Sequence, residues 1–181
     1  MSEDGPSPNI VEPAQAAALA VEVMRHGGVW DHTAISDAVV TRAALASFAE
    51  APPATPPGCE VAIVLTDDSE MRALNRTWRN KDVPTNVLSF PAGDTPHETG
   101  VLGDIVIAYE TARAEADQTG IALPDHVSHL VVHGVLHLLG FDHLDHEEAG
   151  RMEDLEKKAL ASLGIADPYR CADEIRLAET S

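Results

Sequence analysis

Three histidines around position 140 have the residue type and spacing of metal ligands. His133 and His137 are four residues apart, so on a helix their rings would project from one face, about 6 Å from each other along the axis. His143 follows Gly140, whose tolerance of positive φ would let the chain turn back and bring in a third imidazole. Three imidazoles suit zinc, and a pattern without a fourth protein ligand leaves one tetrahedral position to water, as in catalytic sites. We therefore expect one catalytic Zn²⁺ per chain, bound by these three histidines.

Two alternatives to a catalytic site stay open. The histidines could lie on a helix surface without any metal, or the zinc could be structural, with its fourth position closed by Asp142, Asp145 or His146. His126 and His129 continue the same helical stripe, but a metal at the carboxyl end of the helix would be out of their reach. For these two residues we expect surface positions or contacts that support the ligands.

The position after the first histidine separates two kinds of zinc hydrolase. The string HGVLHLLGFDH at residues 133–143 has the ligand and glycine spacing of the metzincin peptidases. Zinc peptidases carry a glutamate at this position as general base. The residue here is Gly134, which can transfer no proton. A peptidase is therefore the weaker interpretation, and a zinc hydrolase of another class stays open.

A basic strip precedes the histidines in the chain. Four of the 12 basic residues lie within ten positions, namely Arg72, Arg76, Arg79 and Lys81. Offsets of four and three place the three arginines on one side of a predicted helix, and a guanidinium can bind a phosphate through two nitrogens at once. The alternative is ordinary surface arginines paired with acids such as Asp68 and Asp82.

The chain as a whole is strongly acidic, with a formal net charge of −18 at pH 7. Such a protein repels nucleic acids and anionic membranes unless its cations are concentrated in one place. We expect the acidic residues between positions 147 and 156 to form a solvated surface that keeps the protein soluble. Any contact with nucleic acid therefore requires a local basic site.

Three motifs in this order resemble the YbeY family of bacterial endoribonucleases: LNRTWRNKDVPTNVLSFP at residues 74–91, LGDIVI at residues 102–107, and the histidine string. The resemblance covers roughly residues 61–169. It implies a single-domain zinc protein that cleaves single-stranded RNA during ribosomal RNA maturation, including the 3′ end of the 16S rRNA. By position, it assigns the metal ligands to His133, His137 and His143, and a catalytic role to Arg79. The partners that it implies are ribosomal RNA, the small ribosomal subunit, ribosomal proteins and an assembly GTPase.

The resemblance gives a functional hypothesis with one non-enzymatic rival. In the hypothesis, zinc activates water or binds a phosphoryl oxygen, while Arg79 holds the phosphate of an RNA phosphodiester. The rival is a ribosome-assembly factor that uses the metal for structure and the arginines for docking. Two features depart from the family: Asn86 stands where an aspartate is common, and residues 170–181 have no counterpart in it.

The elements that must position these residues follow from hydrophobic periodicity and turn signals. Helices are expected at residues 37–48 with Ser36 as cap, 67–78 with an Asp67–Glu70 capping box, 110–118, 124–139, and 145–163 with an Asp145–Glu148 capping box. Strands are expected at residues 61–65, 87–90 and 105–108, while residues 15–30 stay open between a helix and an edge strand. The fold class is therefore α+β: a small mixed sheet of about four strands flanked by helices, with the metal site at the end of a central helix.

One domain is expected over residues 15–169, with residues 1–14 and 170–181 disordered. The start of the chain lacks the basic and apolar segments of a secretory signal, and no apolar run is long enough to span a bilayer. Cys59 and Cys171 are far apart and follow no metal-binding or redox spacing, which fits a reducing compartment. We therefore expect a soluble cytoplasmic protein with no membrane partner.

Overall fold

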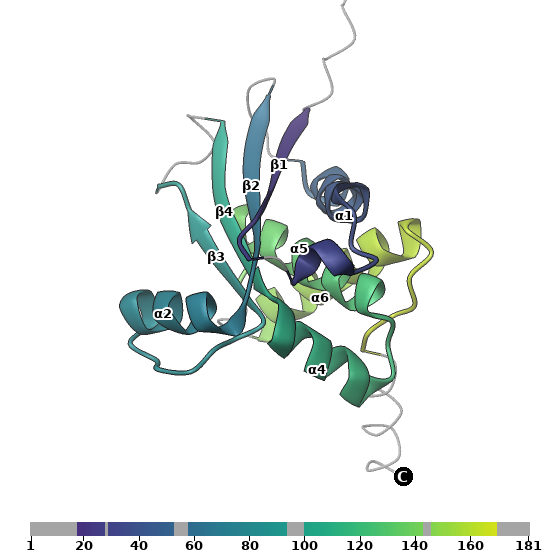
Figure 1. The fold of residues 1–181 in the computed structure, drawn as a ribbon. Helices are drawn as coiled ribbons and strands as arrows, with labels where there is room; N and C mark the ends of the chain where they lie inside the picture. The colour runs from purple at the N-terminus through teal and green to yellow at the C-terminus, as the bar shows by residue number, and fades with distance from the viewer. Residues whose placement is uncertain (1–17, 28, 53–57, 94–99, 143–145, 170–181) are drawn as a thin grey trace, which may run out of the picture.

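A computed structural model describes residues 18–27, 29–52, 58–93, 100–142 and 146–169. Its centre is a four-stranded sheet with the spatial order β1-β2-β4-β3 (Figure 1). The strands are β1 (Leu19–Arg25), β2 (Cys59–Thr66), β3 (Val87–Pro91) and β4 (Val101–Ala108). Strands β1, β2 and β4 are parallel, and β3 pairs with β4 in the antiparallel direction. The predicted α+β fold with a small mixed sheet is confirmed.

Helices cover the two faces of this sheet unequally. They are α1 (Asp37–Glu50), α2 (Asp68–Arg79), α4 (Tyr109–Thr119), α5 (Leu123–Leu138) and α6 (His146–Ser162), with a short 3₁₀ helix at Trp30–His32. Helices α1, α5 and α6 pack together on one face, where the main core lies (Figure 1). Helix α2 packs on the opposite face over β3 and β4, above a smaller core around Met71, Leu88 and Val106. The end of α2 and the end of α5 therefore approach the β3 edge of the sheet from opposite sides.

The segment that the sequence left open between helix and strand forms the edge strand β1. Leu19, Val21 and Val23 pack against the main core, while Glu22 between them is exposed. This alternation is the period of a strand that is buried on one face. The alanines favoured a helix, but pairing with β2 along the whole of β1 outweighs their propensity.

The predicted helix boundaries hold to within two residues where the structure describes them. Asp67 caps α2 as expected, because its carboxylate accepts a hydrogen bond from the backbone N–H of Glu70 at 2.9 Å. The reciprocal half of this capping box is missing, since the Glu70 side chain contacts Thr66 and His26 instead. Ser36 occupies the cap position of α1, yet its side chain makes no capping hydrogen bond.

Strand β4 starts four residues before its predicted beginning. Gly103, outside the predicted strand, lies inside β4 with φ of +133°, at a point where the pairing register with β2 shifts. A Cβ atom at this position would lie 2.1 Å from the carbonyl oxygen of Phe90 on β3. The glycine therefore allows β3 and β4 to approach each other, and it marks a bulge rather than a loop.

Several expectations concern residues outside the described part of the chain. These are the disorder of residues 1–14 and 170–181, the metal-binding role of His143, and the cap at Asp145. Among the helices that the structure describes, none is long and apolar enough to cross a membrane.

Candidate metal centre

His133 and His137 lie in the last turns of α5, and their rings face each other. Their Nε2 atoms are 3.0 Å apart. His133 Nδ1 lies 2.7 Å from Oε1 of Glu156, and His137 Nδ1 lies 2.9 Å from the carbonyl oxygen of Phe141. Because a carboxylate and a carbonyl can only accept hydrogen bonds, both Nδ1 atoms carry the proton. Both Nε2 atoms therefore direct their lone pairs toward one point.

This donor pair fits a zinc ion. Two nitrogens bound to one tetrahedral zinc at about 2.1 Å lie about 3.4 Å apart, close to the 3.0 Å between the two Nε2 atoms. Two converging lone pairs repel each other, and a cation between them removes that repulsion. The third predicted ligand, His143, lies outside the described residues, and within those residues no three His, Cys, Asp or Glu side chains form a metal-binding group. Ligation by His143 stays a prediction.

A buried carboxylate on α6 holds one of the two rings, and the sequence analysis did not find it. Besides its contact with His133, Glu156 receives a hydrogen bond from His129, with 3.1 Å between Nε2 and Oε2. The Tyr169 hydroxyl donates to the same Oε2 atom, and the Tyr169 ring packs edge-on against the His129 ring. His129 is therefore linked to His133 through Glu156, which is a supporting contact and not a metal contact.

The expectation of a solvated acidic surface over residues 147–156 is wrong for Glu156. Its side chain has 0% exposure, because it follows the buried Met152 by four residues and precedes the buried Ala159 by three. Burial by itself raises the pKa of Glu156, but the three hydrogen bonds that it accepts outweigh burial and hold its pKa well below the usual value. Glu156 is therefore ionised at neutral pH and acts as a strong acceptor for the His133 ring.

His126 belongs to a separate hydrogen-bonded group. Its Nε2 atom lies 2.8 Å from Oε2 of Glu115, and the side-chain amide of Asn86 donates to the same oxygen at 2.9 Å. The side-chain oxygen of Asn86 accepts a hydrogen bond from the Val87 backbone N–H at 2.7 Å. The residue that departs from the family pattern thus ties the start of β3 to α4. An aspartate here would place a second negative charge against Glu115, which the amide avoids.

A cleft of about 220 Å³ joins the end of α5 to the end of α2. Its lining includes Arg79, the last residue of α2, Ser89 and Pro91 of β3, and His137 of α5. Asp142, in the turn that follows α5, lies on the same cleft. The structure therefore brings the predicted catalytic arginine and one predicted metal ligand to a single cavity, although 58 positions separate them in the chain.

The arginines of the basic strip on α2 differ in their contacts. Arg72 forms two hydrogen bonds with Asp82, of 2.9 and 2.8 Å, so the alternative of a paired surface arginine is correct for this residue. Asp68 is not part of such a pair, since its carboxylate accepts from the backbone N–H and the hydroxyl of Thr111. Within the described residues, Arg79 has no ion pair and faces the cleft.

Gly134 of α5 packs closely against Ile105 of β4. A Cβ atom at this position would lie 2.9 Å from Cγ2 and 3.0 Å from Cδ1 of Ile105, whose side chain is fully buried. The Ser89 hydroxyl donates to the Gly134 carbonyl at 3.3 Å, so β3 also packs closely here. The position that carries the general base in zinc peptidases therefore has no room for a glutamate.

Replacing Gly134 with alanine should lower the free energy of unfolding by about 1–3 kcal/mol, the usual cost of adding a methyl group to a packed core. The higher helix propensity of alanine offsets part of this cost. Denaturant unfolding measures the effect, and Ile105→Ala in the same chain should recover part of it because the contacted atoms are removed. Strictly additive losses in the double variant would show that this contact is not the cause.

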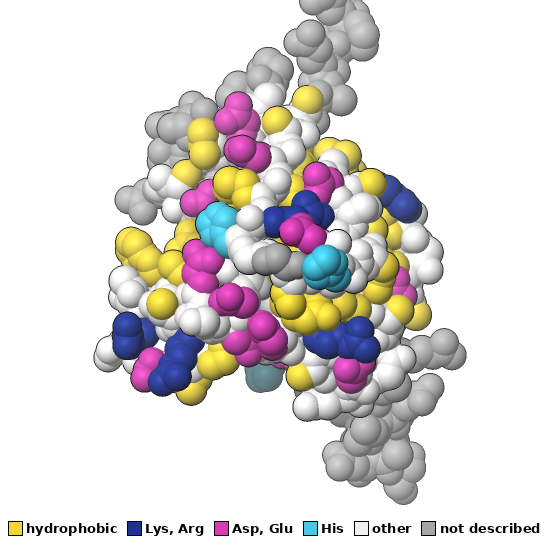
Figure 2. Space-filling view, viewed as in Figure 1, with side chains coloured by type: hydrophobic (Ala, Val, Ile, Leu, Met, Phe, Trp, Pro, Cys, Tyr) yellow, Lys and Arg dark blue, Asp and Glu magenta, His cyan; other side chains and the backbone are white. Residues whose placement is uncertain are grey.

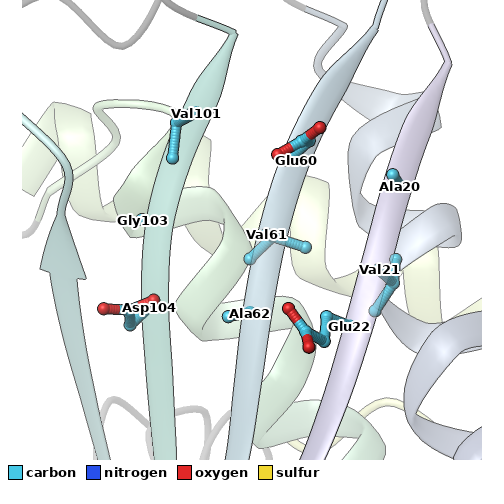
Figure 3. A pocket seen from close by; sticks show the side chains of 9 residues that line it. All are labelled: Ala20, Val21, Glu22, Glu60, Val61, Ala62, Val101, Gly103 and Asp104. Carbon is cyan, nitrogen blue, oxygen red and sulfur yellow. The ribbon is translucent and has the colours of Figure 1, made fainter.

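A larger hollow of about 420 Å³ lies on the open face of the sheet (Figure 3). Glu22 of β1, Glu60 of β2 and Asp104 of β4 point into it, and its described lining includes no histidine, lysine or arginine. Asp104 precedes Ile105 in β4, and the two side chains point to opposite faces of the sheet. Three carboxylates repel a phosphate, so the smaller cleft beside His137 is the better candidate site.

The comparisons with known proteins agree on one family. The family model described as Endoribonuclease YbeY matches residues 31–164. A protein of that name from Rhodopseudomonas palustris (strain ATCC BAA-98 / CGA009) is 45% identical over 174 residues, covering 94% of this chain and 91% of that protein. Another from Paramagnetospirillum magneticum is 57% identical over 116 residues, covering 61% and 71%. The solution structure of TM1509 from Thermotoga maritima has a similar fold, with a TM-score of 0.53 and 19% identity over 82% of this chain and 98% of that chain.

Proposed function

Because the chain belongs to the YbeY family of endoribonucleases, we propose that it is a zinc-dependent enzyme of ribosomal RNA processing and ribosome maturation. Membership makes it an RNA endonuclease, a hydrolase that cuts phosphodiester bonds within an RNA chain. The proposed substrate is single-stranded ribosomal RNA in the cytoplasm, including the 3′ end of the 16S rRNA. A protein with a net charge of −18 binds bare RNA weakly. We therefore include the small ribosomal subunit, its proteins and an assembly GTPase among the proposed partners.

The single observation that carries this proposal is the cleft shared by His137 and Arg79. A nuclease must hold a phosphate beside the group that activates the nucleophile. Arg79 supplies a planar cation for the phosphate, and the Nε2 atoms of His133 and His137 converge beside it. The open acidic hollow on the sheet offers neither group.

Some side chains of the site would bind the metal or the phosphate, and others orient the metal-binding rings. His133 and His137, with His143 as the proposed third ligand, would hold the zinc ion, which supplies Lewis acidity and a source of hydroxide near neutral pH. Glu156 and the Phe141 carbonyl keep the two rings in the tautomer that directs Nε2 inward. Arg79 binds the phosphate and offsets the negative charge that develops on its oxygens in the transition state. Gly134 leaves this site without the general base of a zinc peptidase.

Replacing Arg79 with alanine should lower the cleavage rate about 10²–10³-fold, the usual effect of removing one group that stabilises transition-state charge. Initial rates on a labelled single-stranded RNA measure the loss. Arg72→Ala is the matched control, because this arginine lies on the same helix but is bound to Asp82, away from the cleft. Its rate should stay within about threefold of wild type, since an exposed ion pair contributes at most about 1 kcal/mol. Equal losses in the two variants would mean that general surface charge, and not the cleft, sets the rate.

Two rival functions give different results in simple assays. A peptidase would cleave casein and leave RNA intact, so the two substrates are incubated side by side with the same nuclease-free preparation. A non-catalytic assembly factor would bind small ribosomal subunits without cutting their RNA, even with zinc present. Cleavage on subunits but not on free RNA would support the proposed need for delivery by ribosomal proteins.

A further inference from the structure

Trp78 is the most exposed large apolar side chain of the described residues, at 69%. The other tryptophan, Trp30, is 1% exposed, and its indole N–H donates to the Thr66 carbonyl at 2.7 Å. A single exposed apolar side chain is common on proteins, so the surroundings of this indole must show whether it binds a partner. Val83, 58% exposed, lies in the turn after α2, and the Asn75 side chain hydrogen-bonds its carbonyl at 2.8 Å. The carboxyl end of α2 thus presents a small apolar surface.

The Trp78 ring is held in place by a second aromatic residue. Its centroid lies 6.0 Å from that of Phe90, with an interplanar angle of 63°. Phe90 is half-buried and packs against the small core under α2, on the face of β3 opposite to its neighbours Ser89 and Pro91, which line the cleft with Arg79. Trp78 is therefore a supported aromatic platform, next in the chain to the arginine that faces the cleft.

The charges around this platform favour a polyanion. Arg76, Arg79 and Lys81 are all exposed within three positions of Trp78. Asp82, the nearest acid in the sequence, is bound to Arg72 through both carboxylate oxygens. Figure 2 shows Lys and Arg side chains gathered over α2, on a molecule whose net charge is −18. Proteins that bind single-stranded nucleic acids combine cations along the backbone with aromatic rings on which bases stack.

We propose that Trp78 stacks on an unpaired base of the RNA, adjacent to the phosphate that Arg79 holds, and so selects single-stranded substrate at the cleft. This inference rests on the proposed function, because it takes RNA as the ligand. A paired base cannot offer its face to an indole without leaving its stack. Stacking tolerates any base, so Trp78 selects for strand state and not for sequence.

Tryptophan fluorescence and binding of octauridine test this proposal directly. The measurements are made on the full chain with His137→Ala, so that the RNA stays intact, and RNA length is checked by electrophoresis. Octauridine should quench the emission, and Trp78→Phe, which leaves only the buried Trp30, should show no quenching. Trp78→Ala should bind octauridine about 5- to 150-fold more weakly, the usual range for loss of one base-stacking ring. Trp78→Phe should stay within about threefold of the parent, because its ring still stacks.

An abasic oligomer with the same number of phosphates is the matched ligand control. It should bind the parent and Trp78→Ala equally, whereas Arg76→Ala should weaken binding of both oligomers alike. Equal octauridine affinities for Trp78→Ala and its parent would overturn the stacking proposal, and RNA cleavage by wild type would leave the proposed function standing. Normal octauridine binding by Trp78→Ala, with lost binding to small subunits, would assign the ring to a protein contact and also overturn it. A wild-type protein that neither binds nor cleaves RNA, whether free or in small subunits, would contradict both.

Discussion

Replacing His137 with alanine should abolish RNA cleavage and leave the fold intact. We expect the rate to fall at least about 10³-fold, because losing a ligand costs more than the 10–100-fold that follows loss of a residue supporting a ligand. The fold should survive, since His137 is only half-buried, lies near the end of α5, and has its Nδ1 atom against a backbone carbonyl, that of Phe141. Initial cleavage rates and the melting temperature of metal-free protein measure the two effects.

His126→Ala is the control for this variant. It removes an imidazole from the same helix, but His126 contacts Glu115 and takes no part in the converging pair. Its cleavage rate should stay within about threefold of wild type, and chelation of wild type should reproduce the loss seen with His137→Ala. Comparable rates in the two histidine variants would remove His137 from the reaction.

Replacing Glu156 should weaken metal binding, by an amount that depends on what takes its place. Glu156→Gln keeps the volume of the side chain but loses the charge and one acceptor oxygen, so zinc affinity should fall about 10–100-fold, with a smaller loss of stability in metal-free protein than Glu156→Ala causes. Glu156→Ala also leaves three buried donors without their acceptor, those of His129, His133 and Tyr169. This second variant should lower the free energy of unfolding by about 3–5 kcal/mol. Competition with a zinc chelator measures affinity, and denaturant unfolding measures stability.

Asp154→Asn is the matched control for Glu156→Gln. It makes the same change from carboxylate to amide on the same helix, but Asp154 is exposed and its carboxylate has no part in the hydrogen bonds around the histidines. Its zinc affinity should equal that of wild type. An equal fall in both variants would show that Glu156 acts only through its contribution to the net negative charge, and unchanged affinity in both would deny it any role in holding His133.

The ends of helices and the spacing of side chains along them could be predicted from the sequence, because they depend on residues that are close together in the chain. The spacing of His133 and His137 on a helix, the left-handed glycines that end α4 and α5, and the cap at Asp67 all depend on neighbouring residues. The early start of β4 was not predicted, since the expected strand began at Ile105, and only the pairing of β3 with β4 shows that Gly103 belongs to it. Residue propensity could not show whether the segment of β1 forms a helix or a strand, because its pairing with β2 determines this.

Glu156 was missed although the sequence held a signal for it. It lies on the same side of its helix as Met152, Ala159 and Leu160, a side that is otherwise apolar and buried. A carboxylate on such a stripe requires buried partners, and unassigned histidines on a neighbouring helix are suitable candidates. The identity of those partners depends on how α5 and α6 pack, which residue spacing does not determine.

The cleft itself is a tertiary feature that spacing could not supply. Arg79, Ser89 and His137 come from three elements, and only the crossing of α5 under β3 and β4 brings them together. The family resemblance linked Arg79 with the histidines, and the structure gives the physical basis of that link. It also separates Arg72 from Arg79, two arginines that appear equivalent on a helical wheel.

The zinc content of protein purified without a histidine tag tests the central claim most directly. After equilibration with excess Zn²⁺ and removal of unbound metal, elemental analysis should give one zinc per chain for wild type and for His126→Ala, and close to none for His133→Ala. This result follows from two Nε2 atoms that converge at 3.0 Å, each with its Nδ1 proton held by an acceptor. One zinc retained by His133→Ala, or none in wild type, would contradict the account.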